Sequence, residues 1–110
     1  MNVSRRYVDA VNAADGDTLL ALFAEGAVLR HPLGTYTGHD ELRGFYDSVV
    51  FQGQAVTTLL SVEPLDGGGE LALLSATSKA AEPDAEPMHA ADVFRLDDEG
   101  RITELEIFYR

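Results

Sequence analysis

The chain has 110 residues, 45% of them hydrophobic and 25% charged, and its formal net charge is -11 at pH 7. A chain of this length supports one hydrophobic core, so we expect a single domain over residues 1–110. The negative charge repels phosphate backbones and anionic lipid surfaces, and we therefore expect neither a nucleic-acid nor a membrane partner.

The cysteine and histidine content limits the kinds of catalytic and metal sites that we expect. The chain has no cysteine, which excludes disulfides and thiol catalysis. Its three histidines are too scattered to form a metal-binding motif, so we expect no metal ion and no cofactor. No apolar run approaches the roughly 18 residues that a membrane span needs, and the first residues lack the apolar segment of a secretory signal. We therefore expect a cytoplasmic protein.

The first elements predicted along the chain are two helices. Apolar residues recur at helical spacing over residues 3–14, and Tyr7 lies on the stripe that this spacing buries. Asp17 is expected to cap a second helix, whose apolar residues occupy positions 19–23. Gly26 suits the end of that helix after its last regular residue.

A short strand and a third helix follow. Residues 27–31 are typical of a strand, and Pro32 ends it, so His31 is expected at the exit of the strand. The third helix is predicted from residue 40 to about residue 50, with two acidic residues in its first turn. Tyr46 lies near the buried side of this helix.

The second half of the chain is predicted to be sheet. Four strands are expected over residues 55–62, 70–77, 88–96 and 102–109, because these segments are rich in apolar and β-branched residues and are separated by turn-forming loops. Helices placed at one end of an antiparallel sheet can cover only one face. We therefore expect an α+β fold in which a curved, mixed but mostly antiparallel sheet wraps three N-terminal helices as a cone, with a pocket inside.

Asp92 is an unusual residue for a buried strand. Strand alternation places it on the more apolar face, together with Met88, Ala90, Phe94 and Leu96. A carboxylate taken out of water is paired, solvated or protonated through a raised pKa. A wet strand edge or a bulge would instead turn it to solvent. We expect Asp92 to face the core, where the inward hydroxyl of Tyr7 is a natural partner.

Five segments, taken in order, resemble bacterial ketosteroid isomerases and, more broadly, the nuclear-transport-factor-2-like or SnoaL-like superfamily. They are residues 6–13 (RYVDAVNA), 22–27 (LFAEGA), 31–34 (HPLG), 44–46 (GFY) and 91–96 (ADVFRL). The superfamily hosts isomerases, cyclases, dehydratases, epoxide hydrolases and proteins that only bind ligands. The resemblance covers nearly the whole chain.

The resemblance implies roles for several residues. Tyr7 corresponds to the oxyanion tyrosine and Asp92 to the protonated aspartic acid of the isomerases. Tyr46 corresponds to a supporting tyrosine, and Phe23 stands where some members carry another tyrosine. His31 replaces the aspartate that acts as the base. Neutral imidazole can serve as a general base or proton shuttle near pH 7.

The remaining candidates are weaker. His31 has a second interpretation, in which it is a strand-end residue bonded to Asp92, Tyr36 or water. His39 is expected to be a solvated turn residue, and His89 is expected on the outer face of the sheet. The substrate-binding residues predicted for the interior are Phe23, Tyr46, Met88, Phe94 and Tyr109, although Tyr109 could instead pack at a subunit contact.

The resulting hypothesis is a ketosteroid isomerase-like enzyme that transfers a proton on a small hydrophobic ketone, such as a steroid enone. The alternatives are a ligand-binding member without catalysis and a polyketide cyclase or hydrolase in which His31 and Asp92 form an acid/base pair. We also expect a homodimer through the exposed sheet face, for which alternation selects Thr58, Leu60, Val62 and Leu74.

Overall fold

The structure is a computed structural model that describes residues 2–82 and 84–109. Within these residues the elements are, in chain order, α1 (Val3–Asn12), α2 (Gly16–Ala21), β1 (Phe23–His31), β2 (Gly34–Thr37), α3 (Gly38–Phe45), the π-helix η1 (Tyr46–Phe51), β3 (Ala55–Pro64), β4 (Gly69–Ser78), β5 (Met88–Leu96) and β6 (Ile102–Tyr109). None of the helices in the described residues is long and apolar enough to span a membrane.

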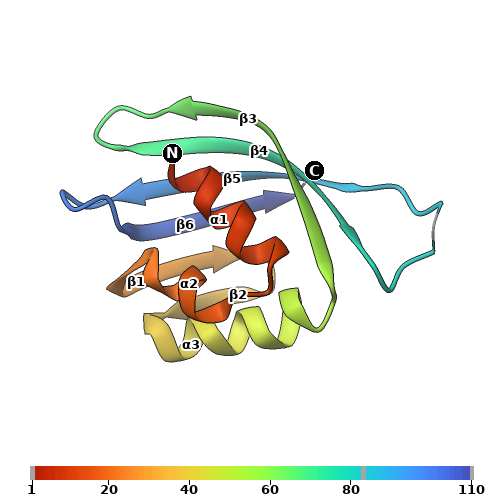
Figure 1. The fold of residues 1–110 in the computed structure, drawn as a ribbon. Coiled ribbons are helices and arrows are strands. Elements are labelled where there is room, and N and C mark those ends of the chain that lie inside the picture. The colour runs from red at the N-terminus through yellow and green to blue at the C-terminus, as the bar shows by residue number, and fades with distance from the viewer. Residues whose placement is uncertain (1, 83, 110) are drawn as a thin grey trace.

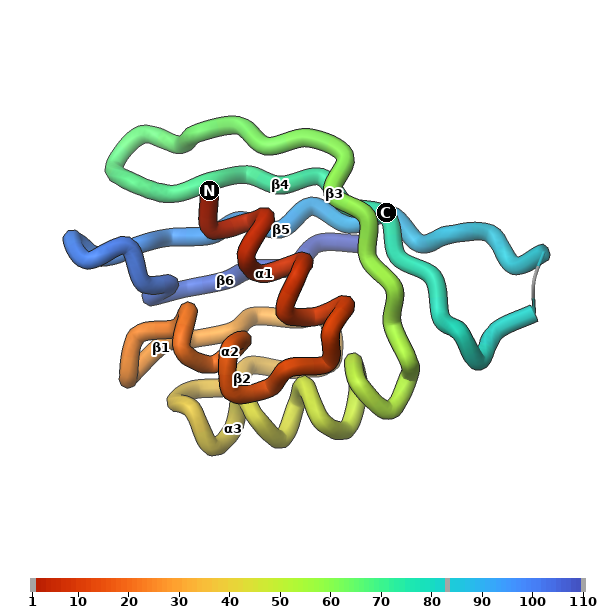
Figure 2. The backbone as a smooth tube through the Cα atoms, in the orientation of Figure 1, coloured from red at the N-terminus to blue at the C-terminus, as the bar shows by residue number. Residues whose placement is uncertain are grey.

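The strands form one sheet in the order β2-β1-β6-β5-β4-β3. β1 and β6 are parallel, whereas the other neighbouring strands are antiparallel. α1 lies across one face of the sheet, and α2 and α3 cover the end formed by β1 and β2 (Figure 1). The tube in Figure 2 shows β3 rising past the C-terminal end of α1 and then turning to run along β4. This architecture confirms the predicted α+β cone.

Side-chain bonds at both ends of α1 fix the helix on the sheet. At its start, Ser4 is fully buried, and its backbone N–H donates to Oε1 of Glu70 on β4 at 3.0 Å. At its end, the side-chain amide of Asn12 donates to the carbonyl of Thr57 at 2.8 Å and accepts from the Thr57 N–H at 2.7 Å. Because both ends are held, the buried stripe of α1 has one orientation, which carries Tyr7 inward.

The second helix and the first strand differ from the prediction. Asp15 rather than Asp17 caps α2, and its carboxylate accepts from the Thr18 N–H at 3.1 Å. The helix ends at Ala21, and the strand begins at Phe23 instead of residue 27. The cause is a distant partner, because Phe23 pairs with Ile102 of β6 before a bulge. Tertiary pairing overrides the helical preference of this segment.

The region from residue 34 to residue 51 also departs from the prediction. Residues 34–37 form β2, which pairs with β1 as a hairpin, where only a turn was expected. The third helix begins at Gly38, two residues early, and becomes π-helical from Tyr46 to Phe51. π-helical turns occur mostly as short bulges at functional sites, and this one starts at a predicted site residue.

A bulge in β3 corrects the expected outer face of the sheet. Strands β5 and β6 have the predicted limits, but the register of β3 against β4 shifts between Leu59 and Ser61. Leu74, which pairs with Leu59 before the bulge, lies on the inner face because β4 alternates with Ala72 and Leu74 inward, and it is only 5% exposed. Val62, opposite fully buried Ala72, is only partly exposed. Of the four residues predicted for the outer face, Thr58 and Leu60 are exposed.

Candidate functional site

Two buried tyrosines meet beneath the concave face of the sheet. Tyr7 comes from α1 and Tyr46 from the first residue of η1, and their hydroxyl oxygens lie 2.8 Å apart. Burial is the main cause that raises the pKa of both phenols well above the usual value, so both stay protonated at neutral pH. The ring of Phe94 packs edge-on to Tyr7 with centroids 5.2 Å apart, and Phe23 lies 6.2 Å from Tyr46.

Asp92 faces the same interior, as strand alternation predicts. It lies on β5 between Ala72 of β4 and Ile107 of β6, and it is 2% exposed. Its Oδ1 atom has no hydrogen-bond partner among the described residues. Desolvation raises the pKa of this carboxyl to about 7. At neutral pH a large fraction of Asp92 is therefore a neutral acid that can donate a hydrogen bond.

Tyr7 and Asp92 line a narrow cavity of about 90 Å³ inside the cone. The polar groups on its wall are the hydroxyls of Tyr7 and Tyr109 and the carboxyl of Asp92. The rest of the lining is Val11, Phe45, Val50, Ala55, Thr57, Leu74, Ala76, Ala90 and Ile107. An apolar wall with a few convergent polar groups is typical of a site for a small hydrophobic molecule.

A wider cleft of about 590 Å³ adjoins the cavity. The two spaces share Val50, Ala55, Ala76 and Tyr109, so they adjoin as one depression with a narrow inner end and a broad mouth. η1 and the segment after β4 border the mouth, where Lys79 lies beside Glu82 and Glu86. Together the two spaces have the size that small-molecule sites commonly show, roughly 300 to 1,000 Å³.

His31 does not line either space, but it contacts a residue that lines both. Its Nε2 lies 2.9 Å from the hydroxyl of Tyr109, and its Nδ1 accepts the N–H of Leu33 at 3.1 Å. The ring packs against Phe45 at a centroid distance of 4.9 Å. Its partner is thus Tyr109 rather than Asp92 or Tyr36. Partial burial lowers the pKa of His31, so the imidazole is neutral at pH 7.

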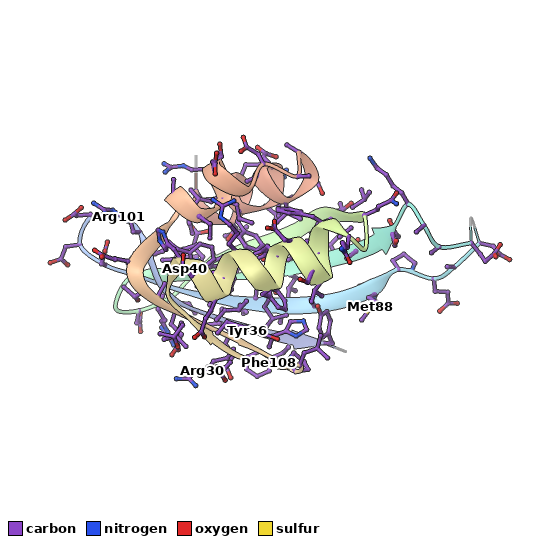
Figure 3. All side chains as sticks on the ribbon, turned by 90° about the horizontal axis from the view of Figure 1, so that it is seen from below. Arg30, Tyr36, Asp40, Met88, Arg101 and Phe108 are labelled. Atoms are coloured by element: carbon purple, nitrogen blue, oxygen red, sulfur yellow. The ribbon has the colours of Figure 1, made fainter. Side chains whose placement is uncertain are left out.

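The predicted substrate contacts divide into two groups. Tyr109 lines both spaces, and Met88, 55% exposed, lies at the broad mouth near the projecting loop (Figure 3). The other three are buried behind the cavity wall: Phe94 under Tyr7, Tyr46 behind its hydroxyl, and Phe23 behind Tyr46. They do not face the ligand space, and they can act on a ligand only through Tyr7.

The other histidines lie away from the cavity. His39 is partly buried, and its Nε2 lies 3.1 Å from the carbonyl oxygen of Phe23, so it contacts the backbone as well as solvent. His89 is exposed near the start of β5, as expected. No group of three or more histidine, aspartate or glutamate residues in the described ranges could hold a metal ion.

Sequence reasoning missed several wall residues. Phe45 and Val50 lie within the predicted third helix but were not predicted as site residues, and nothing in their spacing indicates the π-helical turn between them. Thr57 and Ala76 are paired on the inner face of β3 and β4. Ala76 lies there because β4 alternates with Leu74 inward, whereas the prediction placed Leu74 on the outer face.

Comparison with known proteins gives a family match and several similar structures. The model of the SnoaL-like domain matches residues 4–105. A search of curated proteins found no match. The epoxide hydrolase/cyclase-like enzyme SalBIII, of pyran ring formation in salinomycin, is 25% identical, with a TM-score of 0.81 over 97% of this chain and 87% of its own. A proposed polyketide cyclase from Sinorhizobium meliloti is 25% identical, with a TM-score of 0.81 over 94% of this chain and 90% of its own.

A more distant neighbour has the same fold. This Mycobacterium tuberculosis protein, in complex with estradiol-17β-hemisuccinate, is 17% identical, with a TM-score of 0.80 over 97% of this chain and 90% of its own. At this identity the likeness shows the fold alone. The superfamily resemblance predicted from residues 6–13 through 91–96 is confirmed by the family match.

Proposed function

The chain belongs to the SnoaL-like domain family, and we propose that it is an enzyme that binds a small hydrophobic ketone and moves a proton beside the carbonyl group. The observation that carries this proposal is the composition of the narrow cavity wall. There Tyr7 and Asp92, whose Oδ1 lacks a partner among the described residues, line the same apolar space. Two donors around one oxygen stabilise an enolate.

The contact between the hydroxyls of Tyr7 and Tyr46 supports an assignment of donor and acceptor in these hydrogen bonds. Tyr46 is not on the cavity wall, so its hydroxyl has Tyr7 as its partner at 2.8 Å. When Tyr46 donates to Tyr7, the hydrogen of Tyr7 is left for the ligand oxygen. Protonated Asp92 supplies the second donor. Loss of a proton from the carbon beside the ketone shifts the C–H electron pair toward the carbonyl oxygen, where both donors meet the new charge.

His31 is the proposed base, at the position that the isomerases give to aspartate. In the described geometry Nδ1 is occupied by the N–H of Leu33. Because His31 lines neither space, the exposed turn around Leu33 must open and the ring must rotate into the cavity before Nδ1 can accept a proton from the ligand. This rotation releases Nε2–H from Tyr109. The proton would return to another carbon of the enolate, so the ketone is isomerised without any net gain or loss of atoms.

The test of this proposal uses a β,γ-unsaturated steroid ketone, whose isomerisation to the conjugated enone raises the ultraviolet absorbance. We expect the purified protein to catalyse the change and His31→Ala to lose most of the rate. His89→Ala is the matched control, because His89 is exposed and lines neither the cavity nor the cleft. Full activity in His31→Ala would contradict the proposal that His31 is the base.

A ring-forming or hydrolytic reaction is the second candidate. It is favoured by the engagement of both ring nitrogens of His31, together with the likeness to SalBIII and the proposed polyketide cyclase. In that reaction Asp92, with its pKa of about 7, would itself take up and return the proton. A protein that binds the steroid ketone without isomerising it, in the wild type as well as in the variants, would favour this candidate or a binding protein without catalysis.

We also propose a homodimer through the outer face of the sheet. Leu60, Leu73 and Phe108 are 54%, 45% and 49% exposed, and Leu73 and Phe108 flank Ala91 of β5 from its two neighbouring strands. Figure 3 shows Phe108 on the side of the sheet away from α3. A continuous apolar row across neighbouring strands suits a self-complementary contact.

The dimer proposal predicts a molecular mass of two chains by light scattering at micromolar concentration. Leu73→Glu is expected to yield the monomer, because it places a charge in the middle of the apolar row. Leu33→Glu is the control, since Leu33 is 68% exposed in a turn outside that row. A monomeric wild type at these concentrations would contradict the proposal.

A further inference from the structure

The hydrogen-bond partners of His31 determine its tautomer. A backbone N–H can only donate, so the Leu33 N–H at 3.1 Å requires a lone pair on Nδ1. The neutral ring must then carry its hydrogen on Nε2. The contact of 2.9 Å with Tyr109 is therefore a bond in which Nε2–H donates to the phenol oxygen.

This bond leaves the hydrogen of the Tyr109 hydroxyl available. Within the described part of the chain, the hydroxyl of Tyr109 has no hydrogen-bond partner besides His31. Burial, followed by the charge of Asp92, raises the pKa of Tyr109, so the phenol is a donor at neutral pH. The edge-on packing of the two rings, with centroids 5.2 Å apart, further fixes the tyrosine.

Tyr109 lies where the narrow cavity meets the broad cleft. It lines the cavity together with Tyr7 and Asp92, and it lines the cleft together with Met88. A ligand that spans both spaces, with an oxygen at Tyr7 and Asp92, therefore has Tyr109 on the wall beside it. Near Tyr109 the cavity wall is supplied by Phe45 and by Ala90, its partner on β5, so a second ligand oxygen there would have Tyr109 as its donor.

We propose that Tyr109 is a third hydrogen-bond donor to the ligand, that His31 is its positioning residue, and that the ligand carries a second acceptor oxygen. This inference rests on the proposed function, because it assumes that a first oxygen binds Tyr7 and Asp92. The cavity holds about 90 Å³, less than the roughly 150 Å³ of an engineered cavity that takes up benzene. Only a few atoms fit between the donors, so the class of ligand is a β-diketone or β-hydroxyketone with an apolar tail in the cleft.

The test compares two ligands with the same carbon skeleton. Benzoylacetone has two carbonyl oxygens and butyrophenone has one, and calorimetry measures the affinity of each. We expect Tyr109→Phe to weaken benzoylacetone binding about fivefold, the worth of one neutral hydrogen bond, and to change butyrophenone binding by less than about twofold. His31→Phe, which keeps an aromatic ring beside Phe45, is expected to show the same selective loss, and His89→Phe is expected to show none.

The outcomes separate this inference from the proposed function. If Tyr109→Phe weakens both ligands equally or neither, Tyr109 is not a donor to the second oxygen, and the inference is wrong. If His31→Phe leaves the selectivity intact while Tyr109→Phe removes it, the positioning role of His31 is wrong. If Tyr7→Phe and Asp92→Asn leave both affinities unchanged, the binding site itself is wrong, whatever the result for Tyr109.

Discussion

Asp92→Asn is expected to become more stable relative to the wild type as the pH rises. Burial raises the pKa of this carboxyl from its ordinary value of 3.8 to about 7 in the folded protein. Between these values the folded chain keeps a proton that the unfolded chain has released, so the wild type loses stability as the pH rises toward 7. From pH 5 to pH 8 the free energy of unfolding of the wild type should fall by roughly 2.5 kcal/mol relative to the variant.

Urea unfolding of both proteins at pH 5, 6, 7 and 8 measures this difference. Asparagine carries no charge to desolvate. Any pH-independent free-energy cost of burying its amide is the same at every pH, so it does not affect how the stability difference between the two proteins changes with pH. Asp98→Asn is the matched control, because Asp98 lies in the exposed turn before β6 and should show no such trend. A stability difference for Asp92→Asn that is constant from pH 5 to pH 8 would mean that Asp92 is ionised throughout.

Tyr7→Phe is expected to lower the turnover of the steroid ketone about a hundredfold or more. Removing one donor to a developing oxyanion costs roughly 10²–10³ in rate, because the interaction forms fully only in the transition state. The loss should appear in kcat more than in KM. Phenylalanine keeps the ring that packs against Phe94, so the fold should persist.

Two further tyrosine variants calibrate this result. Tyr46→Phe should cost less than Tyr7→Phe, because Tyr46 acts on the ligand only through its bond to Tyr7. Tyr36→Phe should leave turnover unchanged, since Tyr36 packs on Phe45 and does not line the cavity. Equal losses in all three variants would indicate a general effect of removing a hydroxyl rather than an oxyanion site.

Periodicity predicted the parts of the fold that depend on local pattern. The limits of β5 and β6, the inward face of Asp92 and the buried stripe that carries Tyr7 all follow from spacing along a single element. These features needed no knowledge of which elements pack together. The cone itself followed from the order of the elements, because helices before an antiparallel sheet can cover only one of its faces.

Features that depend on distant partners were not predictable. Strand β1 starts at Phe23 because Ile102 pairs with it, and Val62 turns toward the inner face because one extra residue enters β3. The contact between His31 and Tyr109 joins residues 78 positions apart. Each residue had been considered separately as a site residue, but nothing in either segment indicates that they meet. The position of His31 outside the cavity wall is therefore a result of the structure.

The most direct test of a neutral acid beside Tyr7 is an NMR titration of the Asp92 carboxyl carbon, assigned with Asp92→Asn. We predict a midpoint near pH 7 in the free protein, and a carboxyl that stays protonated to higher pH when benzoylacetone places a carbonyl oxygen in the cavity, because the bound oxygen accepts its hydrogen. A midpoint near pH 4 in both states would show that Asp92 is an ordinary carboxylate and would contradict the oxyanion site.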